Sequence, residues 1–392
     1  MTQSPDAPSP GTDRRDPSLD VLRGGAMLFG VVLHSIIPYL INPLPHLLWP
    51  VRAPAAWTFD ALYWWIHGFR VQMFFLIAGI FAIRSVRSLG TRAFVEHRIR
   101  RLGLPLLAAQ ILVVGALMYP IWALGWICDG LALPKHLWHF RFRHGMQQDL
   151  FGYAHLWFIA YLLLYSLLLA LLMGRGRDGG VRRGGADVDR RGSAWWFVGL
   201  FGATAAWLYV DPRCLLEFHN WFLPRGSELV YHGMFFGAGV WLGDHPATIL
   251  VIRRWWWLAL GCSQAIFPWY FEAIVRWEGA GHVVPAMLAA AYGWTSVLGW
   301  LGFAGACVTR TWPVMEYLSR RAYWLYLIHP PLVGLMQIYL NLCELPAWAK
   351  ATLVFLCASS VGLLMRGPCL EAAGAVERWW RRWRSRSASS RS

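Results

Sequence analysis

Residues 20–42 read DVLRGGAMLFGVVLHSIIPYLIN, an apolar run from Gly24 to Ile41 with a histidine, His34, inside it. A helix needs about 20 apolar residues to cross the hydrocarbon core of a bilayer, and this stretch reaches that length. A histidine inside such a span costs free energy unless it has polar partners, so its position indicates a function. The stretch therefore predicts a first transmembrane helix that carries a functional imidazole.

Arg23 and His34 lie on the same face of this predicted helix. At about 100° per residue their spacing amounts to roughly three full turns, which is about 16 Å along the axis. The stripe between them includes Gly30, whose missing side chain lets another group approach closely. The pattern thus aligns a cation at one membrane surface with a titratable imidazole in the hydrocarbon.

The whole chain has the composition of a polytopic membrane protein. Of its 392 residues 57% are hydrophobic and only 15% are charged, against about 25% charged in soluble domains. We predict an all-α fold, a bundle of about ten transmembrane helices. The net charge of +15 indicates orientation and contact with anionic lipid rather than a nucleic-acid partner. The cysteines show no metal-site spacing, so we expect no metal.

Apolar periodicity places the predicted spans along the chain. They are 22–42, 60–83, 102–125, 155–173, 194–210, 228–243, 255–273, 283–308, 322–342 and 347–366. Most of the 36 Lys and Arg residues fall on the side of the N-terminus, which predicts that this side is cytoplasmic. Both termini are then cytoplasmic, with a disordered tail at 1–19, a membrane domain at 20–366 and a basic, Trp- and Arg-rich tail at 367–392.

The second span brings two more ionisable side chains to the depth of His34. It enters from the outer side and carries His67 and Arg70, which share a helix face. Counted from the outer end of each span, His34 lies about 12 Å deep and the other two about 10 and 15 Å deep. Buried charge needs compensation, so we expect water at this level with a polar substrate or a carboxylate partner.

A cluster of arginines follows at the inner end of the second span. Arg84 lies next to that end, Arg98 and Arg101 come soon after it, and Arg23 joins them from the first span. Guanidinium groups suit the phosphate oxygens of a ligand, which they bind in a bidentate manner. The alternative is ordinary positive-inside charge, and for Arg23 and Arg84 the pattern alone leaves both interpretations open.

Three further segments carry polar groups at the membrane. His155 and Trp157 open the fourth span on the outer side. Glu228 and His232 share a face at the outer end of the sixth, where we expect them to be interfacial and solvated. His329 precedes two prolines that free backbone carbonyls in the ninth span. Those carbonyls could satisfy the imidazole in a structural role, and a catalytic role stays equally open.

Known nucleophile motifs are absent from the sequence, which has no GxSxG, no GxxxxGK[ST] and no HExxH. The histidines and arginines of the predicted spans allow a reaction in which a histidine acts as a general base on a hydroxyl while cations stabilise an anionic donor. That chemistry is acyl transfer from a phosphate-bearing carrier to an alcohol. One alternative is a transporter or flippase for an anionic or lipid-linked sugar. Another is a membrane scaffold, which leaves the buried His and Arg unexplained.

Several segments occur in an order that is more specific than any of them alone. They are Leu19-Asp20-Val21-Leu22-Arg23-Gly24 followed by His34, Tyr63-Trp64…His67-Gly68-Phe69-Arg70, Phe74-Phe75-Leu76, His155-Leu156-Trp157-Phe158, and Tyr317-Leu318-Ser319…Tyr323-Trp324-Leu325-Tyr326-Leu327-Ile328-His329-Pro330. In this combination the chain resembles the membrane-bound acyltransferase-3 family, and more closely its branch of enzymes that succinylate periplasmic glucans. The chain departs from the family pattern at Ala78, where a serine is common.

The resemblance implies that 20–366 is a transmembrane acyltransferase domain of the bacterial inner membrane. It implies that acyl-CoA is presented from the cytoplasm and that a carbohydrate hydroxyl is acylated at the outer face. His34 corresponds to the family's essential histidine and Arg23 to its paired arginine. Arg84 matches a further arginine of the family.

We therefore expect an integral membrane O-acyltransferase that transfers a succinyl or an acetyl group, with His34 and Arg23 as its catalytic residues. The residues expected to hold the phosphates of coenzyme A are Arg23, Arg84, Arg98 and Arg101. The residues expected to line the acceptor side are His67, Arg70, His155, Trp157 and His329. The expected partners are acyl-CoA, the carbohydrate acceptor and the lipid bilayer, with no tightly bound cofactor and no nucleic acid.

Overall fold

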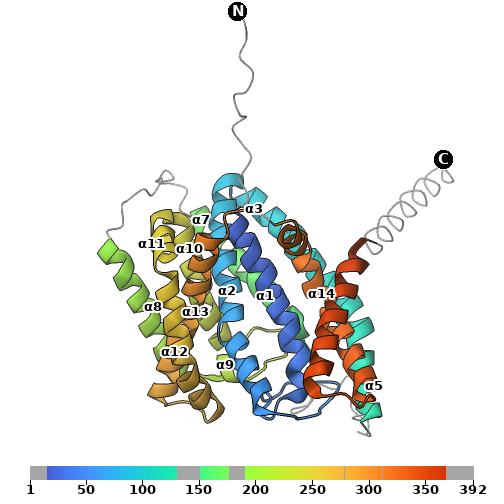
Figure 1. Ribbon diagram of the computed structural model, residues 1–392. Coiled ribbons are helices and arrows are strands. Elements are labelled where there is room, and N and C mark those ends of the chain that lie inside the picture. Colours follow the sequence, from blue (N-terminus) through green and yellow to red (C-terminus); the bar gives the residue numbers. More distant parts are fainter. Residues whose placement is uncertain (1–15, 130–150, 176–189, 278, 311, 368–392) are drawn as a thin grey trace, which may run out of the picture.

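The computed structural model describes residues 16–129, 151–175, 190–277, 279–310 and 312–367 (Figure 1). Within these ranges the chain forms helices and loops and has no β-strand, so the all-α prediction is confirmed for them. The predicted tails lie almost wholly outside the described residues. The boundary of the first tail is wrong, because the first helix already begins at Pro17, where the side chain of Asp16 caps it by accepting from the N–H of Ser18.

The helices have the following bounds in chain order. They are α1 (Pro17–Ile36), η1 (Ile37–Tyr39), α2 (Trp57–Leu89), α3 (Thr91–Arg98), η2 (Ile99–Gly103), α4 (Leu104–Ala109), η3 (Gln110–Met118), α5 (Tyr119–Cys128), η5 (Ala154–Leu156), α7 (Trp157–Arg175), α8 (Arg190–Val210), α9 (Arg213–Leu216), α10 (Gly226–Asp244), α11 (Pro246–Arg254), α12 (Trp256–Val275), α13 (Val283–Cys307), α14 (Pro313–Asn341) and a last helix, Ala347–Gly367. The segments from α3 to α5 form one continuous helical stretch, with π-helical geometry in η2 and η3. Each predicted span overlaps a helix or part of this stretch.

Seven of the described helical stretches are long and apolar enough to cross a membrane, and the bent pair of α10 and α11 raises the number to as many as eight. The pair turns by 105° between Asp244 and Pro246. Leucine and isoleucine side chains, such as Leu107 and Ile111, cover the outside of the α3–α5 stretch, as expected where a helix faces lipid. The protein is thus a multi-pass helical membrane protein, and the number of about ten spans stays a prediction.

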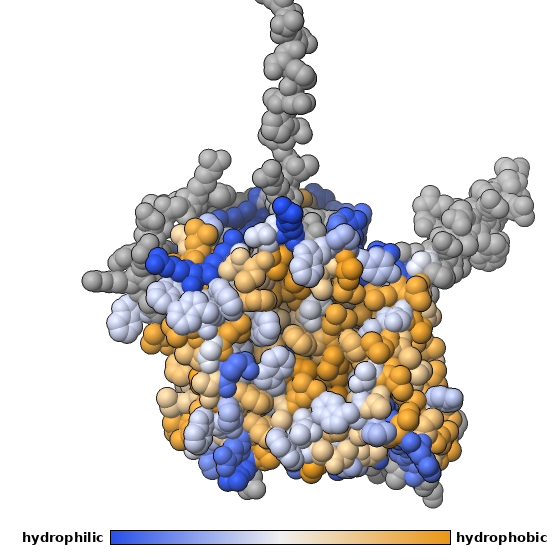
Figure 2. All heavy atoms as spheres, viewed as in Figure 1, coloured by the Kyte–Doolittle hydropathy of each residue, from blue (hydrophilic) through white to orange (hydrophobic). Residues whose placement is uncertain are grey.

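Two ends of the bundle can be distinguished. The start of α1, the end of α2 and the end of the last helix lie toward the same end (Figure 1), which we call the basic end because it carries Arg84, Arg98 and Arg101. Figure 2 shows hydrophilic side chains gathered toward this end and apolar ones across the middle of the face in view. The first and the last described helix thus have their terminal ends on one side of the bundle, and the assignment of that side to the cytoplasm stays a prediction.

Glycines hold α2 close to α10. A Cβ on Gly79 would overlap the backbone of α10 at Phe236, and a Cβ on Gly239 would overlap the carbonyl group of Leu76. Small residues at such a crossing let two membrane helices approach and pack through their backbones. On its other side α2 packs against α1, which in turn packs against α14. Helix α2, which carries His67 and Arg70, is therefore packed between α10 and α1.

Candidate active site inside the bundle

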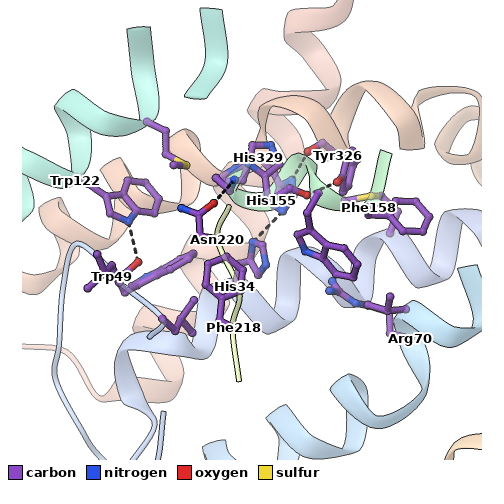
Figure 3. Close-up of a pocket in the computed structure, with 18 of the residues that line it drawn as sticks. His34, Trp49, Arg70, Trp122, His155, Phe158, Phe218, Asn220, Tyr326 and His329 are labelled. Atoms are coloured by element: carbon purple, nitrogen blue, oxygen red, sulfur yellow. Dashed lines mark hydrogen bonds between the residues drawn. The ribbon is translucent and has the colours of Figure 1, made fainter. Parts of the chain in front are cut away.

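His34 faces α14 in the interior of the bundle (Figure 3). Its Nδ1 lies 3.0 Å from Nε2 of His329, and the two imidazole rings stack with their centroids 4.9 Å apart. Arg23 contacts the same helix nearer the basic end, where its Nη2 donates to the carbonyl oxygen of Ser319 at 3.2 Å. The prediction that Arg23 and His34 share one face of α1 is confirmed, and this face packs against α14.

Two prolines in α14 make backbone acceptors available to two histidines. Because the prolines at 330–331 have no N–H, the carbonyl oxygens four residues earlier, on Tyr326 and Leu327, lack their usual helical donors. Nδ1 of His329 lies 2.9 Å from the first of these oxygens, and Nε2 of His155 lies 3.0 Å from the second. The predicted release of carbonyls in this helix is confirmed, and His155 from the η5–α7 segment is one of the partners.

A cavity of about 110 Å³ lies beside these histidines. The predicted site residues in its wall are His34, Arg70, His155, Trp157 and His329. Most of the remaining wall is aromatic or aliphatic and includes Trp49, Trp122, Phe158 and Tyr326 (Figure 3). Several water molecules fit into such a volume, so the histidines can meet a polar ligand there.

A second cavity, of about 100 Å³, adjoins the first, because His34 and Arg70 line both. His67 also lines it, which confirms the prediction that these three side chains reach one level. Nε2 of His67 lies 3.3 Å from the carbonyl oxygen of Leu215, and its ring stacks on Tyr63. His34 and Arg70 therefore stand where two internal cavities meet.

Arg70 extends its guanidinium group into the bundle against Gly30. A Cβ on Gly30 would lie only 2.5 Å from Nη1 of Arg70, so the glycine leaves the space that this cation occupies, as its place in the stripe predicted. Among the described residues no carboxylate forms an ion pair with Arg70, and its Nε is buried without a hydrogen-bond partner. A half-buried cation with no carboxylate partner in the described part of the chain is suited to bind an anionic group of a ligand.

The arginines that were predicted to hold the donor lie apart from the two cavities. The described linings of both cavities include none of Arg23, Arg84, Arg98 and Arg101. Arg23 is paired with Asp20 at 2.9 Å, whereas Arg84 forms no ion pair within the described ranges. The structure thus brings His34 together with the predicted acceptor residues, and the role of the arginines stays a prediction.

Glu228 and His232 are buried, so the prediction that they are interfacial and solvated is wrong. They are 7% and 5% exposed, and Tyr161 donates a hydrogen bond of 2.6 Å to the carboxylate of Glu228. His232 stacks on Phe75, with ring centroids 4.9 Å apart. The physical reason is that α7 and α2 cover this end of α10, so both residues line the second cavity instead of facing the membrane surface.

The site also contains polar residues that the sequence reasoning missed. Gln337, only 1% exposed, donates to the carbonyl oxygens of His34 and Ser35 at 2.9 and 3.2 Å. Its own oxygen accepts from the indole N–H of Trp49 at 2.7 Å, and this indole packs edge-on against His34. A glutamine inside an apolar helix could have been found, because its amide needs partners in the hydrocarbon. No pattern marks Trp49, which lies in a loop.

These features define a class of protein: an integral membrane helix bundle that holds histidines and an arginine around internal cavities large enough for a polar ligand. The chain belongs to the acyltransferase-3 family, whose profile, described as an acyltransferase domain, matches residues 16–365. The protein is therefore a membrane acyltransferase.

Relatives of the chain include the glucans biosynthesis protein C of Salmonella schwarzengrund, of Salmonella typhi and of Salmonella typhimurium. Each is 30% identical to this chain over 96 residues, which cover 24% of this chain and 24% of the relative. The similarity thus spans about a quarter of the length of these relatives. No solved structure matches the chain.

Proposed function

We propose that the protein is an O-acyltransferase of the bacterial inner membrane, with both termini in the cytoplasm. It moves an acyl group from a cytoplasmic acyl-CoA to a hydroxyl of a carbohydrate at the outer face. The observation that carries the proposal is the position of His34 where the two cavities meet. Its Nδ1 is engaged by His329, and its Nε2 has no hydrogen-bond partner within the described residues. A general base needs such a nitrogen within reach of the proton that it removes.

In the proposed reaction Nε2 of His34 takes the proton of the acceptor hydroxyl while the hydroxyl oxygen attacks the thioester carbon. A C–O bond forms, and the carbonyl oxygen takes up the negative charge. The guanidinium of Arg70, on the wall of both cavities, stabilises this oxyanion. The C–S bond then breaks, and the coenzyme A thiolate receives the proton from His34. The products are an ester and free coenzyme A, and the imidazole returns to its starting state.

The donor is proposed to approach from the basic end. Arg84, Arg98 and Arg101, together with Arg23, would hold the phosphates of coenzyme A in bidentate contacts. The acyl end of the donor must then extend over the distance from Arg23 to His34, which is about 16 Å along the axis of α1. An extended pantetheine arm suits this separation, because it is a narrow, flexible chain that ends in the thioester.

The acceptor is proposed to enter from the opposite end, where the loop after α1 contributes Leu47 and Trp49 to the cavity walls. His67, Arg70, His155 and Trp157, with His329 behind them, would line its path, and the indole of Trp157 can stack on a sugar ring. The names of the relatives support a glucan or another envelope polysaccharide as the acceptor. The acyl group is a succinyl or an acetyl group.

The test uses a deletion strain that expresses either the wild-type protein or His34→Ala. We expect mass spectrometry of the cell-envelope glycans to show that the acyl mass present with the wild type is lost with the variant. An immunoblot of the membrane fraction checks that both proteins are present at the same level. Wild-type acylation by His34→Ala would refute the proposal that this histidine is the base.

A second measurement separates the enzyme from the transporter alternative. Purified wild-type protein in liposomes is supplied with acetyl-CoA or succinyl-CoA, and the release of the coenzyme A thiol is followed. Thiol release by the wild-type protein but not by His34→Ala supports the acyltransferase. Movement of a labelled oligosaccharide across the liposome membrane without coenzyme A would support a transporter instead.

A further inference from the structure

We propose that His329 is a positioning residue that keeps the proton of His34 on Nδ1, so that Nε2 is free to act as the base. The proposal rests on the proposed function and deepens it, since it names the residue that sets the protonation pattern of the catalytic imidazole. It is carried by four hydrogen-bonding distances and by the charges around the first cavity.

The position of the proton on His329 follows from two backbone contacts. Its Nδ1 lies 2.9 Å from the carbonyl oxygen of Tyr326 and 3.1 Å from that of Leu325. A carbonyl oxygen can only accept a hydrogen bond, so Nδ1 must carry a hydrogen and donate. The alternative tautomer would place a nitrogen lone pair against two oxygen atoms. Nδ1 of His329 is therefore protonated.

The charge of His329 follows from its burial and its neighbours. This residue is 1% exposed and lines the first cavity together with Arg70. The described residues in the wall of that cavity include no aspartate or glutamate. A buried imidazolium there, beside the Arg70 cation and without a carboxylate to pair with it, would be costly. His329 is therefore neutral, and because its single proton is on Nδ1, its Nε2 offers a lone pair.

The protonation of His329 determines that of His34. Nε2 of His329 and Nδ1 of His34 are 3.0 Å apart, so one of the two nitrogens must donate. Since Nε2 of His329 has no hydrogen, Nδ1 of His34 is the donor. The neutral imidazole of His34 then has its lone pair on Nε2, which is the nitrogen without a partner in the described chain. The hydrogen bond at one ring nitrogen of a histidine thus decides whether the other nitrogen donates or accepts.

This hydrogen-bonding arrangement depends on the sequence HPP at 329–331. In an uninterrupted helix the N–H of residue 330 would occupy the carbonyl oxygen of Tyr326. The proline leaves this oxygen to His329, and the next proline leaves that of Leu327 to His155 at 3.0 Å. His155 consequently donates from Nε2, while its Nδ1 is buried without a partner and offers a second lone pair beside the first cavity.

The kinetic test compares two substitutions of His329 that differ in the position of their amide group. Glutamine places its amide oxygen near the position of Nε2, where it can accept from His34. Asparagine places its amide near Nδ1 and cannot reach. With purified full-length protein in lipid nanodiscs, acetyl-CoA or succinyl-CoA as donor and a β-glucan oligosaccharide as acceptor, we expect kcat of His329→Gln to stay within about tenfold of the wild type. We expect kcat of His329→Asn to fall about 10²- to 10⁴-fold, with little change in the KM of the donor.

A spectroscopic test needs no substrate. Solid-state NMR of protein labelled with ¹⁵N-histidine distinguishes the two neutral tautomers, and the signal of His34 is identified by its loss in His34→Ala. We expect neutral His34 to be protonated on Nδ1 in the wild type and in His329→Gln. Protonation of neutral wild-type His34 on Nε2 would overturn the proposal.

The outcomes separate the two levels of the argument. If His34→Ala keeps the acyl transfer, the proposed role of His34 as the base fails whatever the NMR spectrum shows. If His34→Ala is inactive while His329→Asn matches the wild type in kcat, the function stands and the positioning role of His329 is refuted. The expected ranking, with glutamine above asparagine at 329, supports both.

Discussion

The substitution Gly30→Ala tests the idea that the site depends on a cation packed against α1. The new Cβ would lie 2.5 Å from Nη1 of Arg70, whereas comfortable contacts between heavy atoms begin near about 3.5 Å. The guanidinium must therefore move by about 1 Å. A displacement of that size in an active site can lower the rate about 10²-fold, which corresponds to about 2.7 kcal/mol in the activation barrier. We expect kcat/KM to fall by about this factor.

The matched control for this prediction is Gly25→Ala on the same helix. A Cβ on Gly25 meets nothing within 4 Å, and alanine is favoured over glycine in a helix by roughly 0.5–1 kcal/mol. We expect the control to have wild-type kcat/KM and an equal or higher melting temperature. Coenzyme A thiol release measures the activity of both variants, and thermal unfolding in detergent measures their stability. Equal activity of the two variants would refute the argument that Arg70 needs the space at Gly30.

Two further predictions concern the packing that holds the site. Gln337→Leu removes the acceptor of the Trp49 indole and the donor to the carbonyl oxygens of His34 and Ser35. Each buried group left unsatisfied costs about 1–3 kcal/mol, so we expect a lower melting temperature. An unchanged melting temperature would contradict the role of Gln337 in holding the site together. Gly239→Ala places a Cβ against the backbone of Leu76, whereas the control Gly237→Ala places one where nothing lies within 4 Å. We expect only Gly239→Ala to reduce the yield of monodisperse protein in size-exclusion chromatography. Equal yields of the two variants would contradict the close α2–α10 crossing.

Several features of the site followed from local helix geometry alone. The spacing of Arg23 and His34 predicted that they share a face, and both contact α14. Counting residues from the outer ends of two spans placed His67 and Arg70 at the level of His34, and all three line one cavity. These predictions hold because rise and rotation per residue are nearly constant in an α-helix, so positions within one helix can be calculated without knowledge of its neighbours.

The sequence by itself determined that this protein is a multi-pass helix bundle and that His34, His67 and Arg70 reach the middle of it, because apolar length and helical spacing are properties of each segment alone. Only the tertiary structure decided which helices meet. His34 finds its partner 295 residues away in the chain, at His329, and Glu228 is enclosed because α7 covers the end of α10. A helix's own periodicity shows which of its faces is polar, but the neighbour that this face meets is selected by the packing of the whole bundle.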